Sequence, residues 1–478
     1  MKFDDISLLL PELVQILIIL GLFVQTLMKS ETGATTDIGV RWVPWAAAVG
    51  IIVSAYSLKT SGSLFWDAYQ MDGLSQFFKM AVALGFTIAT LNAVNTPTVK
   101  NEQRTDYFLF FALSSLGLML LASSVELITI YISLEIASYS LYAIIPLRGN
   151  DPRAAEAGIK YILFGAAATA IALFGLSYIL ASQNTTYLHI LATKSWSWSA
   201  APMAVVGLTL FMVGFFFKLA LFPFHFWCPD VYDGTSNETA AFAATLPKLG
   251  AVVILIRLVA LLKPEIEIVS IMAVLSAASM TFGNLAALAQ KDVKRILGYS
   301  SVAHAGYVLV GLVAASAAGL SAAGFYSLIY LLMNLTCFWV ICSLSRDGKN
   351  LLLDDLNGLY QRAPYLAFIL AVGAFALVGL PPTAGFIGKL FLLTAAWNRG
   401  YNWLIIIAAL NTAISIYYYL NIVRHAYTHE AEENIQFEEP RRYSSIWGGV
   451  LAASLLVLGV MPEPVFRWME AAARQIIP

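Results

Sequence analysis

The sequence predicts an all-α, polytopic membrane protein, and three observations lead to this fold class. Of the 478 residues, 59% are hydrophobic and only 12% are charged, whereas a soluble domain has about 25% charged residues. The mean hydropathy is +0.75. Apolar stretches of about 20 residues, the length that a helix needs to cross a bilayer, recur along the whole chain. A water-soluble globule cannot cover so much apolar surface, so we expect the chain to cross the membrane many times.

We expect about fourteen transmembrane helices joined by short loops, with two inverted five-helix repeats between the first three helices and the last one. The expected helices cover residues 8–28, 41–58, 72–94, 106–123, 125–147, 155–182, 201–226, 239–262, 266–288, 295–315, 321–345, 363–396, 401–427 and 443–461. The expected organisation is 1–104 for helices 1–3, 105–262 for the first repeat (helices 4–8), 263–427 for the second repeat (helices 9–13), and 428–478 for a polar loop and helix 14.

The orientation follows from the Lys and Arg residues of the loops and tails. With the N-terminus outside, sixteen of these residues face the cytoplasm and seven face outward. Because cytoplasmic loops of membrane proteins are enriched in Lys and Arg, both termini are expected on the outer side. In a bacterium this is the periplasmic side of the inner (plasma) membrane.

Composition and motifs exclude several classes of function. The formal net charge is −1, without the basic footprint of nucleic-acid binding. Cys228, Cys337 and Cys342 form no C-x-x-C pair, so we expect no structural zinc or iron–sulfur cluster held by this chain alone. Neither a Walker A motif nor a dinucleotide-binding glycine fingerprint is present. Energy for uphill transport must therefore come from another gradient or from a partner.

Glu135 lies in the middle of an apolar run, residues 127–147, and its side chain is too short to reach water. A charge in the middle of a spanning helix costs roughly 2.5–3.5 kcal/mol on insertion scales, so an intramembrane carboxylate indicates function. The alternative is a neutral carboxylic acid that is hydrogen-bonded to Ser133 or Ser138. Glu126, at a helix start, is expected to stay hydrated and to favour the positive end of the helix dipole.

Lys218 precedes an expected break in helix 7. It lies in Gly-Phe-Phe-Phe-Lys-Leu-Ala-Leu-Phe-Pro-Phe-His, residues 214–225, where Pro223 frees the carbonyl of Leu219. Broken helices are tolerated in membranes only where protein or water satisfies the freed backbone groups. We therefore predict a buried, hydrated pocket around Lys218. The alternative is a lysine that only binds the free carbonyls.

Helix 12 repeats this arrangement in Gly-Leu-Pro-Pro-Thr-Ala-Gly-Phe-Ile-Gly-Lys, which ends at Lys389. Residues 381–385 cannot continue a regular helix. The two interrupted helices, each with a lysine, are five helices apart, and an odd offset places the two repeats in opposite senses across the membrane. Inverted repeats with binding sites at broken helices are typical of secondary transporters.

Further ionisable groups lie in the expected helices. Lys248 follows Pro247 in helix 8, and His304 lies in helix 10 beside Ser and Tyr residues that suggest a hydrated path. A lone buried histidine is also common as a satisfied core residue. We expect Lys79 to extend its ammonium to the interface, and Arg257 either to do the same or to pair with a neighbour.

One carboxylate and three lysines on four helices suit protons better than organic substrates. With Glu135 close, Lys218 would keep its proton; with Glu135 distant, the proton would pass through water to Lys248 and by way of His304 toward Lys389. Moving a proton against about 200 mV requires roughly 4.6 kcal/mol, or roughly 3 pKa units. Changes in desolvation and ion pairing can supply about 3–5 units.

Three stretches resemble signature motifs of antiporter-like membrane subunits: residues 214–234, with Pro-Asp-Val-Tyr after the break, residues 293–307 and residues 379–389. In this order, and over essentially the whole chain, they resemble the subunit N family of bacterial proton-pumping NADH:quinone oxidoreductase (complex I, NDH-1). The family usually has a Pro-containing run before helix 8, where this chain has Thr-Ser-Asn-Glu-Thr, residues 235–239.

The resemblance implies a role for each candidate residue. Glu135 and Lys218 would form the coupling pair, Lys248 the central relay, His304 a connecting residue and Lys389 the terminal relay. No cofactor would bind this chain, because NADH, FMN, iron–sulfur clusters and quinone would be on partner subunits. The partners would be other complex I membrane subunits, including a neighbouring antiporter-like subunit and small membrane subunits, together with the lipid bilayer and protons.

Two other functions are consistent with the same residues. The chain could be an antiporter-like subunit of a multi-subunit cation/proton antiporter or of a membrane-bound hydrogenase, because these share the fold and the buried charges. It could also be a scaffold in which the buried charges are satisfied and move no protons. The first alternative is tested by the neighbouring genes, which would encode either quinone-reductase subunits or antiporter subunits. The second is tested by replacing Glu135 or Lys218 with alanine: normal proton pumping in the assembled enzyme would favour the scaffold.

Overall fold

The computed structural model describes residues 6–32, 39–149, 151–262, 266–345, 347–428 and 442–477. It divides into two compact units. Unit 1 comprises Met1–Lys218, Gly234–Ile268 and Ala471–Pro478, and unit 2 comprises Leu219–Asp233 and Val269–Glu470. The predicted polar loop at 429–441 lies outside the described residues. So do four basic residues counted for the orientation, Lys2, Lys263, Arg346 and Arg441.

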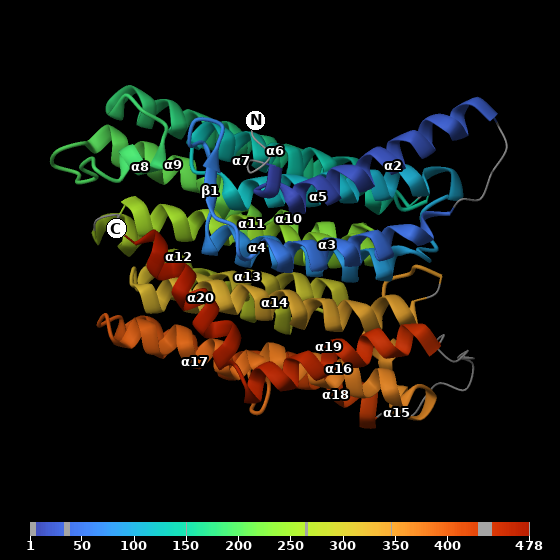
Figure 1. Ribbon diagram of the computed structural model, residues 1–478. Coiled ribbons are helices and arrows are strands. Elements are labelled where there is room, and N and C mark those ends of the chain that lie inside the picture. Colours follow the sequence, from blue (N-terminus) through green and yellow to red (C-terminus); the bar gives the residue numbers. More distant parts are fainter. Residues whose placement is uncertain are drawn as a thin grey trace. The chain divides into compact units, whose positions relative to one another are not determined.

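In unit 1, long helices run side by side (Figure 1). Its elements are α2 (Leu10–Thr32), η1 (Val40–Trp42), α3 (Val43–Ser57), β1 (Gly62–Leu64), β2 (Tyr69–Met71), α4 (Gly73–Ala93), η2 (Asn101–Gln103), α5 (Arg104–Ser123), α6 (Leu127–Ile144), α7 (Pro152–Gln183), α8 (Leu188–Leu191), α9 (Pro202–Leu219) and α11 (Asn237–Leu262). The helix α11 is buried along its whole apolar length and packs against α4, α5 and α6.

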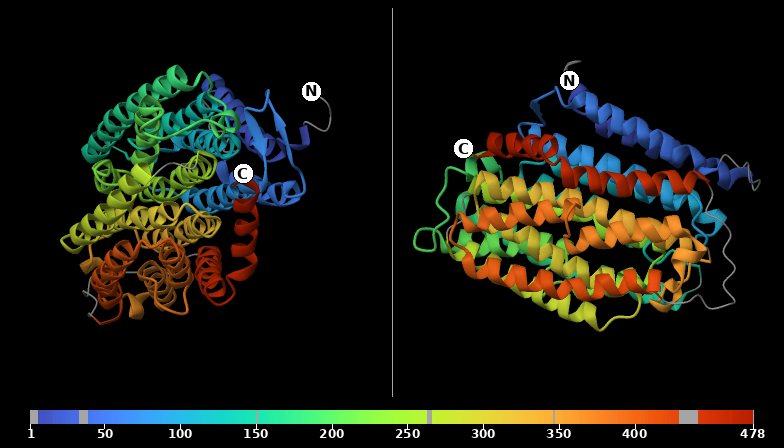
Figure 2. Two further views of the ribbon diagram at one scale, coloured as in Figure 1. Left: turned by 90° about the vertical axis from the view of Figure 1, so that its left-hand side faces the viewer. Right: turned by 90° about the horizontal axis from the view of Figure 1, so that it is seen from below.

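Unit 2 is also built from long helices that run side by side (Figure 2). Its elements are α10 (Trp227–Gly234), α12 (Ile266–Leu288), α13 (Val293–Val313), α14 (Ala317–Leu344), η3 (Asp354–Leu356), α15 (Leu359–Arg362), α16 (Pro364–Val378), α17 (Ala384–Trp397), α18 (Asn402–Thr428), α19 (Arg442–Val460) and α20 (Glu463–Ile476). Three of these elements begin or end across the unit boundary, namely α10, α12 and α20. The helix α13 is almost entirely buried and packs against α14, α17 and α18.

The all-α, multi-pass fold is confirmed. Among the described residues, twelve helices are long and apolar enough to cross a membrane, and the pair α19 and α20, bent by 73°, makes a thirteenth if it is counted as one span. The two shorter apolar helices α16 and α17 together occupy the range expected for helix 12. Each of the fourteen expected helices therefore has a counterpart.

Both predicted helix breaks are present. After α9 ends at Leu219, residues 220–226 are not helical, and α10 begins at Trp227. The helix α16 ends at Val378, and α17 begins at Ala384. The second break is therefore shorter than the predicted 381–385: Ala384 and Gly385 are helical, since the prolines end at Pro382. Gly379 forms the end of α16 with φ of +86°, a left-handed conformation that glycine adopts without the steric cost of a side chain.

Two features of the fold were not expected from the sequence. The strands β1 and β2 form an antiparallel hairpin with Gly62 opposite Met71, and its turn uses Phe65, Trp66 and Asp67 at positive φ rather than the usual Asn or Gly. The helix α20 was not expected either, because its apolar residues are too few for a membrane span. Within unit 2, its Phe466 packs against Phe391, with ring centroids 4.2 Å apart and ring planes tilted by 40°.

The unusual segment before Lys248 forms a well-defined helix start. The Ser236 hydroxyl accepts a hydrogen bond from the backbone N–H of Thr239 at 3.1 Å, as an N-cap side chain does. The Thr235 hydroxyl donates to the carbonyl of Ile145 at 2.9 Å. Buried Arg148 donates to the carbonyls of Gly234 and Thr235, each at 3.2 Å. Serine and threonine side chains thus fix the start of α11.

A first prediction concerns the close approach of α16 and α17. A Cβ atom on Gly385 would overlap the carbonyl oxygen of Ala376, so Gly385→Ala must force the two half-helices apart. Overpacking of this kind costs about 1–3 kcal/mol, and we expect a lower thermal unfolding midpoint of the protein in detergent. Gly50→Ala is the matched control, because its Cβ would meet only Val14 at 3.7 Å. Equal midpoints for the two variants would contradict so close an approach of the two half-helices.

Candidate functional site

In unit 1, Glu135 lies on α6 and Lys218 at the end of α9, within electrostatic reach of each other. Both are buried, with 6% and 2% of their surface exposed. Among the described residues the two groups form no direct ion pair, and the hydroxyl groups that act on the Glu135 carboxylate are those of Tyr139 and Thr169, beyond close hydrogen-bond geometry. Ser138 donates instead to the backbone of Leu134 at 2.6 Å. The alternative of an acid satisfied by its neighbouring serines is therefore wrong.

Aromatic rings surround the Lys218 ammonium. It donates a hydrogen bond to the Tyr161 hydroxyl at 3.2 Å, and it lies 5.0 Å and 5.7 Å from the ring centroids of Tyr161 and Tyr142. Ring faces stabilise a cation only modestly. Gly165 on α7 leaves room for the Tyr142 hydroxyl, which a Cβ atom there would overlap. The site therefore holds the lysine without fixing it in a direct ion pair.

Lys248 is the third predicted residue of unit 1. It is 4% exposed and lies on α11 directly after Pro247, and α11 continues through this proline. A proline inside a helix removes one backbone hydrogen bond and frees the carbonyl four residues earlier, here that of Ala243. Lys248 is thus buried next to a position where its own helix lacks a backbone hydrogen bond.

Lys389 lies in unit 2, on α17 just after the second break. Its ammonium donates to the carbonyls of Val378 at 2.8 Å and Leu377 at 3.3 Å, the last residues of α16, whose carbonyls have no partner within the helix. It also lies 4.5 Å from the ring centroid of Tyr307. The break therefore supplies the lysine with carbonyl dipoles rather than with a carboxylate.

His304 on α13 lies in a network of tyrosines. Its Nδ1 is 2.7 Å from the Tyr326 hydroxyl, and its Nε2 is 3.1 Å from the Tyr419 hydroxyl. Tyr419 also bonds to Ser300. The histidine is thus hydrogen-bonded on both nitrogens, one of which can accept while the other donates. Since each partner is a hydroxyl, which can reverse its direction, the arrangement suits either a core residue or a proton relay.

Hydroxyl and amide groups extend this network on both sides. The Tyr307 ring lies between Lys389 and His304, with centroids of Tyr307 and His304 6.1 Å apart, and its hydroxyl bonds to Thr412 at 2.7 Å. The remaining links are Ser301 to Tyr330 and Tyr232, Tyr418 to Asn284 at 2.9 Å, and Asn284 to Asn411 at 3.2 Å. Unit 2 therefore contains a polar strip across its buried helices.

The structure thus brings the predicted residues together in two sets: Glu135 with Lys218 in unit 1, and His304 with Lys389 around Tyr307 in unit 2. The sequence did not identify Tyr142, Tyr161, Tyr326 or Tyr419 as members. Tyrosines are common in apolar helices, so the sequence does not distinguish these four. Only their contacts in the structure show that they surround Lys218 and His304.

Two basic residues differ from the expectation of interfacial side chains. The ammonium of Lys79 does not extend to the interface: it is 1% exposed and pairs with Glu12 at 2.7 Å, so that expectation is wrong. Arg257 is also 1% exposed and holds Asp72 with two hydrogen bonds of 2.7 Å and 2.9 Å, which confirms the alternative of a paired arginine. Glu126 is 6% exposed, so the expectation that it stays hydrated is wrong. Its carboxylate does lie at the helix start, where it caps α6 by accepting a hydrogen bond from the Thr129 backbone N–H at 2.7 Å.

The segment after the first break ends in an ion-pair cluster of unit 2. Arg295 pairs with Asp230 at 2.9 Å and with Asp233 at 3.6 Å, and Asn350 donates to the Asp233 carbonyl at 3.0 Å. Burial raises the pKa of the neighbouring Asp292, which caps α13. These contacts fix α10, so Asp230 of the Pro-Asp-Val-Tyr motif and the following Asp233 serve here to hold the broken helix.

Comparison with known proteins agrees with this geometry. The family described as NADH:quinone oxidoreductase/Mrp antiporter, TM, matches residues 124–415, a range that contains all five candidate residues. A protein of Solidesulfovibrio magneticus named NADH-quinone oxidoreductase subunit N 2 is 59% identical over 470 residues, which cover 98% of this chain and 99% of that protein.

Solved structures show the same fold. A chain of respiratory complex I from Thermus thermophilus superimposes with a TM-score of 0.82 at 30% identity, covering 96% of this chain and 98% of that one. A chain of the Mrp complex from Dietzia sp. gives a TM-score of 0.87 over 100% and 98% of the two chains, but at 17% identity this likeness shows the fold alone. The chain therefore belongs to the NADH:quinone oxidoreductase/Mrp antiporter family and, within it, to the subunit N group of NADH-quinone oxidoreductase.

Proposed function

We propose that this chain translocates protons as the subunit N of an NADH-quinone oxidoreductase, through Glu135, Lys218, Lys248, His304 and Lys389. One observation carries the proposal: each of the two helix breaks has a buried lysine which, in the described part of the chain, no carboxylate contacts directly. A buried ammonium without a contacting counter-ion is costly, and intramembrane lysines are otherwise found on ion and proton pathways.

Each lysine has a means of releasing and regaining its proton. In unit 1, a movement of Glu135 toward Lys218 would stabilise the ammonium, and a movement away would favour proton release. In unit 2, Lys389 is held by carbonyl dipoles and a ring face, next to the hydroxyl network of His304. We propose that helices 4–8 (105–262) and helices 9–13 (263–427) act as two such functional repeats, with Lys248 as the relay between them.

The driving reaction would take place on partner subunits. We propose that NADH, FMN, the iron–sulfur clusters and quinone bind there, and that the direct neighbours of this chain are an antiporter-like subunit and small membrane subunits. The chain would lie in a bacterial inner membrane. Its Lys and Arg distribution favours both termini on the periplasmic side.

The proposal is tested by Glu135→Gln in the assembled complex, reconstituted in vesicles, with protons moved per NADH oxidised as the readout. Glutamine keeps the shape of the side chain but cannot attract Lys218, so we expect fewer protons per NADH. Glu156→Gln is the matched control, because Glu156 is 64% exposed and pairs with Lys160 on the same helix. An unchanged ratio in both variants would remove Glu135 from the pathway.

A second candidate function, cation/proton antiport, is favoured only by the fold shared with the Mrp complex chain. It predicts proton movement that depends on a sodium or potassium gradient in vesicles. The first function predicts proton movement that depends on NADH oxidation and proceeds without either cation.

A further inference from the structure

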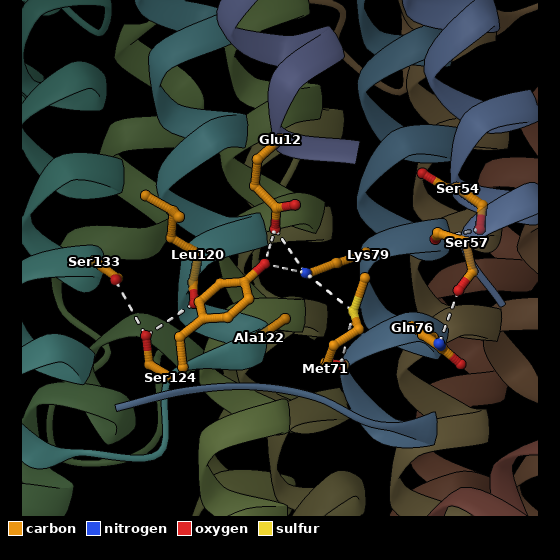
Figure 3. Close-up of polar contacts among 12 residues, drawn as sticks. Glu12, Ser54, Ser57, Met71, Gln76, Lys79, Leu120, Ala122, Ser124 and Ser133 are labelled. Atoms are coloured by element: carbon orange, nitrogen blue, oxygen red, sulfur yellow. Dashed lines mark hydrogen bonds and ion pairs between the residues drawn. The ribbon is translucent and has the colours of Figure 1, made fainter. Parts of the chain in front are cut away.

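A second buried ion pair lies in unit 1, formed by Glu12 on α2 and Lys79 on α4, and each side chain is 1% exposed (Figure 3). The Lys79 ammonium is 2.7 Å from the Glu12 carboxylate. It also donates to the Tyr69 hydroxyl at 2.6 Å, and this hydroxyl donates to the same Glu12 oxygen, Oε1, at 2.9 Å. The carboxylate of Glu12, the ammonium of Lys79 and the hydroxyl of Tyr69 are therefore each bonded to the other two.

The other carboxylate oxygen of Glu12 is unsatisfied. Oε2 is buried and has no hydrogen-bond partner among the described residues. An ionised carboxylate can accept about four hydrogen bonds, and leaving a buried carboxylate oxygen unsatisfied is unfavourable. A structural ion pair would gain from saturating this oxygen. An oxygen that is to take up a proton has to keep a lone pair available.

Another ion pair, Asp72 with Arg257, lies near Glu12 and Lys79 and affects the charge of the cluster. Lys79 interacts electrostatically with Asp72 and Arg257 as well as with Glu12. Because Asp72 and Arg257 neutralise each other through two hydrogen bonds, the cluster has one negative and one positive charge left, on Glu12 and Lys79. One additional proton would leave it with a single positive charge on Lys79, which faces the Tyr69 ring at 4.8 Å.

We propose that Glu12, Lys79 and Tyr69 form a second proton-binding site of this chain, separate from Glu135 and Lys218. The proton is taken up from water at Oε2 of Glu12, which becomes a neutral carboxylic acid while Lys79 stays an ammonium. Its release restores the ion pair. The Tyr69 hydroxyl accepts from Lys79 and donates to Glu12, so it holds both groups in place while Glu12 gains or loses its proton. The site rests on the proposed function in so far as its proton is used in translocation.

The main alternative is a purely structural pair that fastens α2 to α4. The double variant Glu12→Gln/Lys79→Met separates the two roles, because replacing both partners of a buried ion pair by neutral side chains of similar size is often neutral for stability or stabilising. The assembled complex is compared with wild type in thermal unfolding and in protons moved per NADH. We expect unchanged unfolding and a loss of protons per NADH; unchanged values of both would overturn the proposal.

Tyr69→Phe is the second variant, and it decides if the double variant fails to assemble. It keeps the ion pair and the ring packing but removes the hydroxyl that links the two groups. If the three residues bind a proton for translocation, Tyr69→Phe lowers the number of protons moved per NADH. If Glu12 and Lys79 form only a structural pair, that number stays unchanged. Tyr56→Phe, an exposed tyrosine on α3, is the control.

A parallel Glu135→Gln sample separates this inference from the proposed function. A loss in Glu135→Gln together with unchanged values in the double variant and in Tyr69→Phe would refute the second site and leave the proposed function in place. A loss only in the variants of the second site would refute the pathway through Glu135 and support the second site.

Discussion

Replacing Lys218 with methionine is expected to slow proton transfer through this chain by roughly 100-fold. Methionine fills a similar volume between the rings of Tyr161 and Tyr142 but holds no proton. A proton would then cross the middle of the membrane without a group that can bind it. An unstabilised charge there costs roughly 2.5–3.5 kcal/mol. Since about 1.4 kcal/mol corresponds to a tenfold change in rate, this cost gives the expected slowing. Proton movement into vesicles on addition of NADH measures this effect.

Lys59→Met is the matched control for this variant. Lys59 is exposed and follows α3, so its replacement should leave proton movement unchanged. Lys218→Met needs normal assembly to be informative. We expect it, because the Glu135 carboxyl group that loses its electrostatic partner can take up a proton and become neutral. Normal proton movement in an assembled Lys218→Met complex would contradict a role for the first helix break.

Replacing Arg257 with methionine is expected to have the largest effect on stability, about 3–5 kcal/mol. The change leaves Asp72, only 11% exposed, without the two hydrogen bonds that neutralise it, and it removes a donor from the Ala122 carbonyl. Asp72 also caps α4 through Ser75. The thermal unfolding midpoint and the amount of assembled complex measure the loss.

A compensating variant tests the reason for this loss. In Asp72→Asn/Arg257→Met the buried charge is absent, while asparagine still caps α4, so much of the stability should return. Arg467→Met is the control, because its pair with Glu463 is 74% and 73% exposed and such surface pairs contribute about 0–1 kcal/mol. A double variant as unstable as Arg257→Met alone would show that the charge of Asp72 is not the cause.

The sequence predicted those site residues whose charge is unusual for the apolar helix that contains them. Glu135 and Lys218 are recognisable because charged side chains do not belong in apolar runs. The breaks near Pro223 and Gly379 are recognisable because proline removes a backbone hydrogen bond and glycine favours a helix end. Proline alone is not decisive, since α11 continues through Pro247. The all-α fold followed from the lengths of the apolar segments alone.

The rest depends on contacts between residues far apart in the chain. Lys79 lies where an extended side chain would reach the interface, and only the packing of α2 against the helices of unit 1 places Glu12, 67 residues earlier, beside it. The tyrosines around His304 look like any others in apolar helices. The β1–β2 hairpin, which places Tyr69, lacks the turn residues that normally indicate one.

The central claim is that the buried Glu135 carboxyl group changes its protonation or its contacts while NADH is oxidised. Infrared difference spectroscopy of the assembled complex, before and after addition of NADH, tests this most directly. We predict a carboxyl band in the wild-type difference spectrum that is absent in Glu135→Gln and retained in Glu156→Gln. Wild-type and Glu135→Gln spectra that superimpose throughout the carboxyl region would contradict the account.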